Sequence, residues 1–163
     1  MKFTCEMLTS RVVFGAGSLD QLPDELDRLG LSRVVILSTP EQQDQAQRVA
    51  GLIGSRAVTI FDQAVMHVPV ETQNAAIQVV KDADIDGGVA IGGGSTTGLG
   101  KAIALELDFP FIAIPTTYAG SEMTPIWGLT AEGVKQTGRN ERIRPRTVIY
   151  DPTLTLSCRV RAA

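Results

Sequence analysis

The sequence predicts an α/β protein built on a doubly wound, mainly parallel β-sheet. Short runs rich in β-branched residues alternate with helical stretches, which is the pattern of βαβ units with right-handed crossovers. The run Arg33–Ser38 is apolar almost throughout, as is typical of a parallel strand buried on both faces. At 163 residues, the chain fits one domain.

The elements follow from the spacing of apolar residues. Continuous apolar and β-branched runs predict strands, and apolar residues three and four apart predict helices. The predicted strands lie at residues 11–14, 33–38, 57–61, 88–91, 111–114 and 147–150. The predicted helices lie at residues 18–29, 40–52, 70–83 and 96–107.

Capping patterns predict where two of the helices begin, and a polar segment follows the fifth predicted strand. Ser18 and Gln21 have the spacing of a capping box, and Thr39, which a proline follows, has the pattern of a helix N-cap. Residues 115–146 are rich in Thr, Gly, Arg and Glu, with a short strand-like piece at 127–130.

Composition excludes several classes of function. Fifteen basic and eighteen acidic residues give a net charge of −3, which argues against a nucleic-acid or anionic-membrane binder. No apolar run is long enough to span a bilayer, and no signal peptide is evident. Cys5 and Cys158 are too far apart for metal-ligand spacing, so we expect free thiols in the reducing cytoplasm.

The most informative segment is a glycine-rich turn. Gly92, Gly93 and Gly94 follow a predicted buried strand, and Ser95 then opens a predicted helix. Glycines allow close approach of a ligand to the backbone, and the start of a helix presents unpaired N–H groups that favour an anion. The turn therefore predicts a phosphate or pyrophosphate site, with a tight turn that binds no ligand as the alternative.

Two known phosphate motifs do not fit this turn. A P-loop would require glycine at Ser95 and a hydroxyl residue at Ala102. A G-x-G-x-x-G pattern counted from Gly92 would require glycine at Thr97. If the turn binds a phosphate, it therefore does so through neither of these two motifs.

A second candidate loop, residues 115–124, follows the next predicted strand. It contains Thr116, Thr117 and several small residues, whose hydroxyls can hydrogen-bond a ribose, an adenine or a phosphate. A polar surface loop is the alternative. Because loops at the carboxyl ends of successive parallel strands meet at one edge of the sheet, both loops point to one crevice.

These and other segments together identify a family. The segments are Gly92–Ser95, Ile114–Thr117, Thr147–Pro152, Phe61–Pro69, Pro115–Gly128 and Lys135–Arg139. Over about residues 5–156 the sequence resembles the nucleotide-binding half of the iron-containing alcohol dehydrogenase family. The last three segments are similar to its maleylacetate reductase branch.

The resemblance implies a Rossmann-like dinucleotide-binding domain over residues 1–156, which binds NADH or NADPH. For this branch it implies reduction of the carbon–carbon double bond of maleylacetate, a small dicarboxylate, to 3-oxoadipate in aromatic-compound catabolism. It also implies a homodimer in the full-length family, in the cytoplasm, with no nucleic-acid or membrane partner.

The resemblance also assigns residues to the cofactor. They are Gly93, Gly94 and Ser95 at the pyrophosphate, Thr116, Thr117 and Tyr118 along the cofactor, and Lys135 and Thr39. Thr39 stands where many relatives have an aspartate that binds the adenosine ribose. Without that carboxylate a 2′-phosphate is not repelled, so we expect use of both NADH and NADPH.

His67 is the one histidine of the chain, and the resemblance places it on the substrate side of the site. On residue type alone it is equally an ordinary loop or core residue. One histidine with Asp62 nearby cannot form a metal site, so the family's iron or zinc has no ligands here. We also expect no catalytic residue within this chain.

Other residues are assigned by their pattern alone. Lys101 is expected on a helix surface or behind the site, rather than on a phosphate, and Trp127 is expected to pack. The charged run 139–146 is a solvated loop or, alternatively, a sink for substrate or cofactor anions.

Family members are about twice as long, with a second, all-helical domain that this sequence does not show. Residues 157–163 match nothing in the family, so we expect an aberrant tail after a truncation or frameshift. Such a chain alone is expected to be inactive. A generic alcohol or polyol dehydrogenase and a non-catalytic nucleotide-binding fragment are the alternatives.

Overall fold

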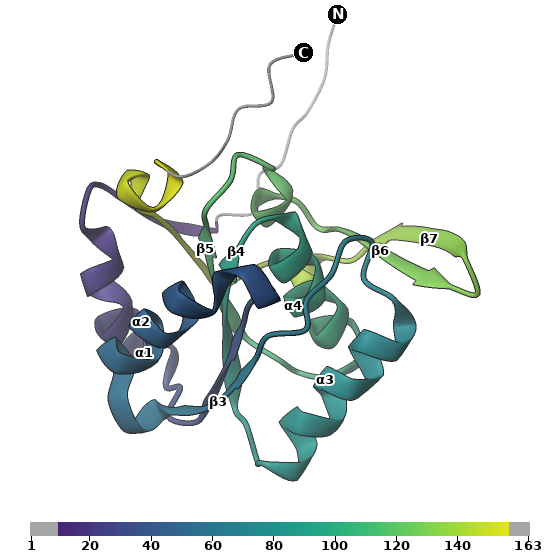
Figure 1. The fold of residues 1–163 in the computed structure, drawn as a ribbon, viewed down its shortest axis with the longest axis horizontal. Helices are drawn as coiled ribbons and strands as arrows, with labels where there is room; N and C mark the ends of the chain where they lie inside the picture. The colour runs from purple at the N-terminus through teal and green to yellow at the C-terminus, as the bar shows by residue number, and fades with distance from the viewer. Residues whose placement is uncertain (1–9, 157–163) are drawn as a thin grey trace, which may run out of the picture.

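A computed structural model describes residues 10–156, which form an α/β fold around one six-stranded sheet (Figure 1). The strand order is β1-β8-β5-β4-β2-β3, and every neighbouring pair is parallel. The strands are β1 (Arg11–Phe14), β2 (Val34–Leu37), β3 (Ala57–Phe61), β4 (Gly87–Gly92), β5 (Phe111–Pro115) and β8 (Thr147–Tyr150). The helices are α1 (Leu22–Leu29), α2 (Gln43–Ile53), α3 (Val70–Asp82) and α4 (Gly94–Glu106). The predicted fold class is confirmed.

Helices cover both faces of the sheet, and each face has its own apolar core. Helices α1 and α2 lie on one side, and α3 and α4 lie on the other (Figure 1). In β2, Val34 and Ile36 pack on the α1–α2 side, whereas Val35 and Leu37 pack on the α3–α4 side. Because successive side chains of a strand point to opposite faces, a strand covered on both faces is apolar at every position, as β2 is.

The predicted capping box at Ser18 is wrong. Its hydroxyl donates to the carbonyl of Tyr150 (3.1 Å), and a 3₁₀ turn at Ser18–Gln21 precedes α1. The backbone N–H groups of Gly17 and Leu19 donate instead to the buried carboxylate of Asp151, at 3.1 and 3.2 Å. A carboxylate that follows β8 thus performs the capping that the local sequence predicts for Ser18 and Gln21.

The N-cap predicted at Thr39 is confirmed only in its position. Thr39 is the residue before a 3₁₀ turn, Pro40–Gln42, but its side chain makes no capping hydrogen bond. Helix α2 begins after that turn, at Gln43. The side chains of Thr39 and Gln42 are therefore available for contacts outside the helix.

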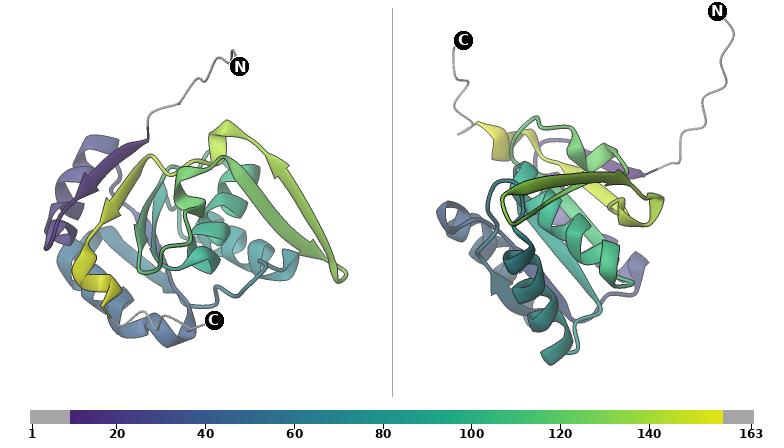
Figure 2. Two further views of the ribbon diagram at one scale, coloured as in Figure 1. Left: turned by 90° about the horizontal axis from the view of Figure 1, so that it is seen from above. Right: turned by 90° about the vertical axis from the view of Figure 1, so that its right-hand side faces the viewer.

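A two-stranded antiparallel hairpin, β6 (Ile126–Ala131) and β7 (Val134–Arg139), projects from the body of the fold (Figure 2). The sequence predicts only residues 127–130 of it. Strand β7 is polar and mostly exposed, so it lacks the apolar run that identifies the other strands. Glu132 and Gly133, both with positive φ, form the tight turn between the two strands.

Among residues 10–156, no helix is both long enough and apolar enough to cross a bilayer. The predictions for Cys5, Cys158 and the tail 157–163 fall outside the described part of the chain.

Candidate functional site

The candidate site is built on the turn between β4 and α4. Gly92 ends β4 with φ +143°, a backbone conformation that residues with a side chain rarely adopt. Gly93 is the N-cap of α4. A Cβ on Gly92 would also collide with the side chains of Gln42 and Thr96. The turn therefore requires glycine at position 92 for the conformation of the backbone and for the space around it.

Gly93 and Gly94 leave the start of α4 uncovered by side chains. A Cβ on Gly93 would lie 3.1 Å from Oγ1 of Thr117, and a Cβ on Gly94 would meet nothing closer than 3.7 Å, at Ala119. Packing within the protein thus accounts for glycine at position 93 but not at position 94. The first N–H groups of an α-helix have no intrahelical acceptor and suit an anion, and at Gly94 an anion can approach them closely.

The loop after β5 lies directly beside this turn. The backbone N–H of Thr116 donates to the carbonyl of Gly92 at 2.9 Å, and Thr116 is buried. Strands β4 and β5 are paired up to Gly92 and Pro115, so the two loops leave the sheet together. The predicted meeting of the two loops is confirmed.

Gln42 joins Thr39 to this cluster, a connection that the sequence analysis missed. Its Nε2 donates to Oγ1 of Thr116 at 2.9 Å, and Oγ1 of Thr39 donates to its Oε1 at 3.4 Å. Thr39, at the end of β2, is thereby connected to the loop after β5 across the glycine turn. The signal in the sequence was present but pointed elsewhere, since Gln42 sits where a capping residue is common.

His67 and Lys135 lie on the other side of Gly94. Both line a cavity of about 280 Å³, with Gly94, Lys101 and Trp127 among its other lining residues. Lys135 comes from the hairpin strand β7, and His67 comes from the loop between β3 and α3. The structure therefore gathers the predicted residues into two groups, one on each side of the start of α4.

The loop that carries His67 is strained and is held by the hairpin. His67 has φ +67° and Val68 has φ +38°, an unusual value for a β-branched residue. Oγ1 of Thr130 donates to the carbonyl of His67 at 2.9 Å, and its backbone N–H donates to the carbonyl of Val68 at 3.1 Å. Such strain persists only where the surroundings enforce it, and here strand β6 does so.

Tyr118 and Ser95 are placed less tightly. Tyr118 is 82% exposed, and its hydroxyl lies 3.0 Å from Oγ1 of Thr155. It therefore reaches toward the 3₁₀ turn at Pro152–Thr155. Ser95 is half-buried in the first turn of α4.

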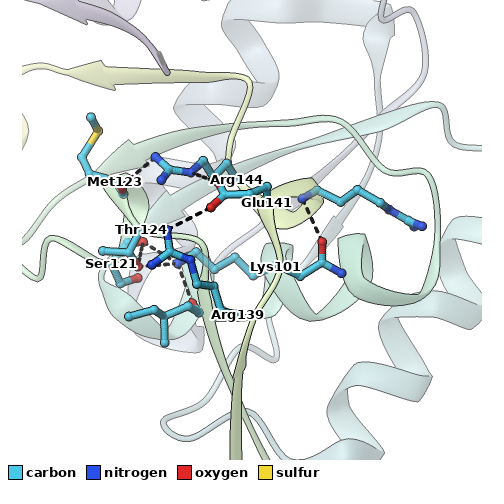
Figure 3. Close-up of polar contacts among 10 residues, drawn as sticks. Lys101, Ser121, Met123, Thr124, Arg139, Glu141 and Arg144 are labelled. Carbon is cyan, nitrogen blue, oxygen red and sulfur yellow. Dashed lines mark hydrogen bonds and ion pairs between the residues drawn. The ribbon is translucent and has the colours of Figure 1, made fainter. Parts of the chain in front are cut away.

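Lys101 is not on a helix surface, so that part of the prediction is wrong. It is 1% exposed, and its Nζ donates to the carbonyls of Ser121 and Ile126 and to Oγ1 of Thr124 (Figure 3). Burial lowers its pKa to about 8, with Glu122 acting in the opposite direction.

The charged run 139–146 is partly structural. Glu141 pairs with Arg139 at 3.1 Å and with Arg144 at 2.7 Å, and Ile143 between them is fully buried (Figure 3). The run thus also contributes to the core through Ile143, a role that neither predicted alternative, a solvated loop or an anion sink, includes. Trp127 is half-buried against the apolar core and leaves no space for a Cβ on Gly138, so packing is one of its roles.

Metal-ligating residues do not cluster in the described part of the chain. Residues 10–156 contain no group of three or more His, Cys, Asp or Glu side chains that could hold a metal ion. The donors that these residues offer at the glycine turn are N–H groups, hydroxyls and an amide, which suit a phosphate and a sugar better than a metal.

Comparison with known proteins identifies the family of this chain. The family model described as iron-containing alcohol dehydrogenase matches residues 9–152. Maleylacetate reductase of Burkholderia cepacia is 59% identical over 159 residues, which are 98% of this chain and 45% of that protein. Maleylacetate reductase of Sphingobium indicum is 55% identical over 157 residues, which are 96% of this chain and 44% of that protein.

Solved structures show the same fold. Maleylacetate reductase from Agrobacterium tumefaciens has a TM-score of 0.95 at 49% identity, over 98% of this chain and 45% of that one. Sulfoacetaldehyde reductase from Bifidobacterium kashiwanohense, in complex with NAD+, has a TM-score of 0.88 at 25% identity, over 96% of this chain and 48% of that one. The chain thus spans a little under half the length of these relatives.

Proposed function

The chain belongs to the iron-containing alcohol dehydrogenase family, and from that premise we propose that it binds a nicotinamide dinucleotide at the turn between β4 and α4. The observation that carries the proposal is Gly94. Glycine there leaves the first N–H groups of α4 open to an anion, and packing within the protein does not require it. In addition, the sulfoacetaldehyde reductase of the same fold is solved in complex with NAD+.

The two groups of residues suggest how the cofactor would lie. The pyrophosphate would bind at Gly93, Gly94 and Ser95. The adenosine half would extend toward Thr39, at the carboxyl end of β2, with Gln42 and Thr116 beneath it. The nicotinamide half would lie toward the cavity lined by His67 and Lys135, with Thr117 and Tyr118 on the loop between.

The residue at the end of β2 bears on the choice of cofactor. In Rossmann-type sites, a carboxylate near this point hydrogen-bonds the ribose hydroxyls and repels a 2′-phosphate. Thr39 has no charge, and its hydroxyl is 3.4 Å from the Gln42 amide oxygen. We therefore propose that the chain accepts both NADH and NADPH.

The proposed reaction is the reduction of maleylacetate to 3-oxoadipate in aromatic-compound catabolism, with this chain supplying the cofactor half of the site. The similarity to maleylacetate reductases at 59% and 55% identity supports it. When bound, the reduced nicotinamide supplies a hydride. The chain's own residues bind and orient the cofactor, and His67 would border the dicarboxylate. A generic alcohol or polyol dehydrogenase and a non-catalytic nucleotide-binding fragment are the competing functions.

The remaining proposals concern the whole protein. We propose that residues 1–156 form the dinucleotide-binding domain, and that the full-length protein is a cytoplasmic homodimer. Because the relatives are about twice as long, activity would require the part of the site that the remaining half of such a protein supplies.

The test is a titration of the 163-residue chain with NADH, and separately with NADPH, followed by energy transfer from Trp127. The variant is Gly94→Ala. The structure has room for the added methyl group, but the methyl group would block the close approach of a phosphate to the backbone. The matched control is Gly51→Ala in α2, another helical glycine with open space around it. We expect saturable binding that Gly94→Ala weakens by about tenfold or more and that Gly51→Ala leaves unchanged. Binding that survives Gly94→Ala would remove the turn from the proposed site.

A further inference from the structure

Lys101 is a buried charge whose hydrogen-bonding capacity is directed at one segment. An ammonium has three N–H donors. Here the three acceptors are the carbonyls of Ser121 and Ile126 and the hydroxyl of Thr124, the last two at 2.9 and 3.2 Å. All three belong to residues 121–126, which connect the loop after β5 to the hairpin.

Apolar packing alone does not explain a lysine at this position. Taking an ammonium out of water is unfavourable by several kcal/mol, and a methionine would fill a similar space in the helix without that cost. Burial is the main cause that lowers the pKa of Lys101 to about 8, and the nearby guanidinium of Arg144 acts in the same direction. Glu122 acts in the opposite direction, but it is already the acceptor of a hydrogen bond from Tyr150, at 2.7 Å.

The same segment is held from two further elements. Tyr150 of β8 binds the carboxylate of Glu122, which is 3% exposed. Arg144 donates from Nη1 to the carbonyl of Met123 at 3.1 Å, while its Nε binds Glu141 (Figure 3). Residues 121–126 are therefore anchored from α4, from β8 and from Arg144, which directly follows the 3₁₀ turn Glu141–Ile143.

This anchor lies at one end of the exposed part of the loop. At the other end, Thr116 is fixed by its bonds to Gly92 and Gln42. Residues 118–120 between the two anchors are exposed and lie beside the start of α4, where Ala119 is the nearest neighbour of a Cβ placed on Gly94. What fixes residues 121–126 therefore also sets where residues 118–120 lie above the turn.

We propose that Lys101 is a positioning residue that holds the loop after β5 in place beside the glycine turn. Gly94, Gly98 and Lys101 follow one another at spacings of four and three residues, so they lie on one face of α4, and all three line the cavity. Helix α4, which offers its first N–H groups to the cofactor, thus also fixes the position of the loop after β5. This inference rests on the proposed cofactor site.

The test combines two measurements on the whole chain. The variant Lys101→Met removes the ammonium and keeps an unbranched apolar side chain. Lys81→Met, at an exposed lysine in α3, is the matched control. The first measurement is the rate at which chymotrypsin cuts after Tyr118, identified by mass spectrometry, and it requires no ligand. The second is the Kd for NADH between pH 7 and pH 9.

We expect Lys101→Met to be cut after Tyr118 several times faster than the control and to bind NADH about tenfold more weakly at pH 7. The Kd of the unaltered chain should rise as the pH passes through about 8, because a neutral amine has one donor fewer, and the Lys101→Met value should lack this rise. Glu122 and Arg144 face the ammonium, and His67 and Lys135 line the cavity; all four are present in both proteins. A difference between the two proteins in how Kd depends on pH therefore follows from removal of the Lys101 amine.

Two results would overturn the proposal. One is equal cutting of Lys101→Met and the control, and the other is faster cutting with an unchanged Kd. If Lys101→Met does not fold, Thr124→Val, which removes one acceptor and leaves the charge, should give a smaller change in the same direction in both measurements. If the unaltered chain binds no NADH, the proposed function fails, and the cutting rate alone shows whether Lys101 holds the loop.

Discussion

Replacing Gly100 by alanine should destabilise the protein, although alanine is the better helix former. Gly100 lies inside α4, against β5. A Cβ there would be 2.8 Å from Cε2 and 3.0 Å from Cδ2 of Phe111. The ring of Phe111 is fully buried and stacked on Phe109, with 6.4 Å between the ring centroids. Because both rings lie in a closely packed interior, the added methyl group must displace the helix or the ring.

The expected magnitude follows from two opposing effects. Glycine to alanine in an exposed helix is worth about 1 kcal/mol in favour of the folded state. Overpacking of a core by one methyl group costs about 1–3 kcal/mol. For Gly100→Ala we therefore expect a net loss of about 0–2 kcal/mol. Gly51→Ala in α2, which has open space around it, should gain up to about 1 kcal/mol.

The assay is urea unfolding of both variants, followed by far-ultraviolet circular dichroism. The quantity of interest is the difference in unfolding free energy between Gly100→Ala and Gly51→Ala, in which helix propensity cancels. A second comparison combines Gly100→Ala with Phe111→Leu, a smaller side chain, and the loss in the double variant should be less than the sum of the single losses. If Gly100→Ala is as stable as Gly51→Ala, the close approach of α4 to β5 is not tight, and the reasoning is refuted.

Three other substitutions give expected results from charge. Burial raises the pKa of Glu25, but the hydrogen bonds that Arg11 and Arg28 donate to its carboxylate outweigh burial, so the pKa lies below 4.5. The stabilisation that the ionised carboxylate gives the folded protein is therefore present above pH 4.5 and is lost as the pH falls through the lower pKa of the folded state. In urea unfolding at pH 7, we expect Glu25→Gln to be less stable by about 1–3 kcal/mol, and its stability should depend less on pH in the acid range. The pKa of Lys101 is lowered from 10.5 to about 8, so the unfolded chain binds more protons between these values, and the unfolding free energy relative to Lys101→Met should rise across that window. Thr39→Asp should weaken NADPH about tenfold more than NADH in parallel titrations, since its carboxylate would face the 2′-phosphate; equal weakening of both cofactors would place the adenosine ribose elsewhere.

The elements that could be predicted from the sequence are those whose signal is local. The buried strands are continuous apolar runs, and the glycine turn after β4 stands between such a run and a helix. The adjacency of the two loops followed from the general rule for parallel sheets, and the backbone bond from Thr116 to Gly92 confirms it. The strands and the turn are determined by residues within a few positions of them, and the adjacency of the loops follows once the strands are known to be parallel.

What the sequence could not show depends on contacts between residues far apart in the chain. Asp151 caps the turn before α1 from a position 134 residues away from Gly17. Gln42 reaches Thr116 across 74 residues, and Lys101 reaches Ser121 across 20. Each of these polar groups has an equally ordinary local explanation in the sequence, as a turn residue, a cap or a helix-surface lysine. Only the fold shows that the long-range contact, and not the local one, is formed.

The glycines at the end of β4 and in α4 show that one glycine-rich motif can combine residues with different roles. In the sequence they form one glycine-rich stretch, but the structure separates them by what each would meet. A Cβ would collide with Gln42 at Gly92, approach Val68 at 3.0 Å at Gly98, and enter the ring of Phe111 at Gly100. At Gly94 it would meet only open space and Ala119. Substitutions at the first three positions therefore report on folding and packing. An alanine at Gly94 leaves those contacts intact, so its effect on cofactor affinity can be attributed to the ligand alone.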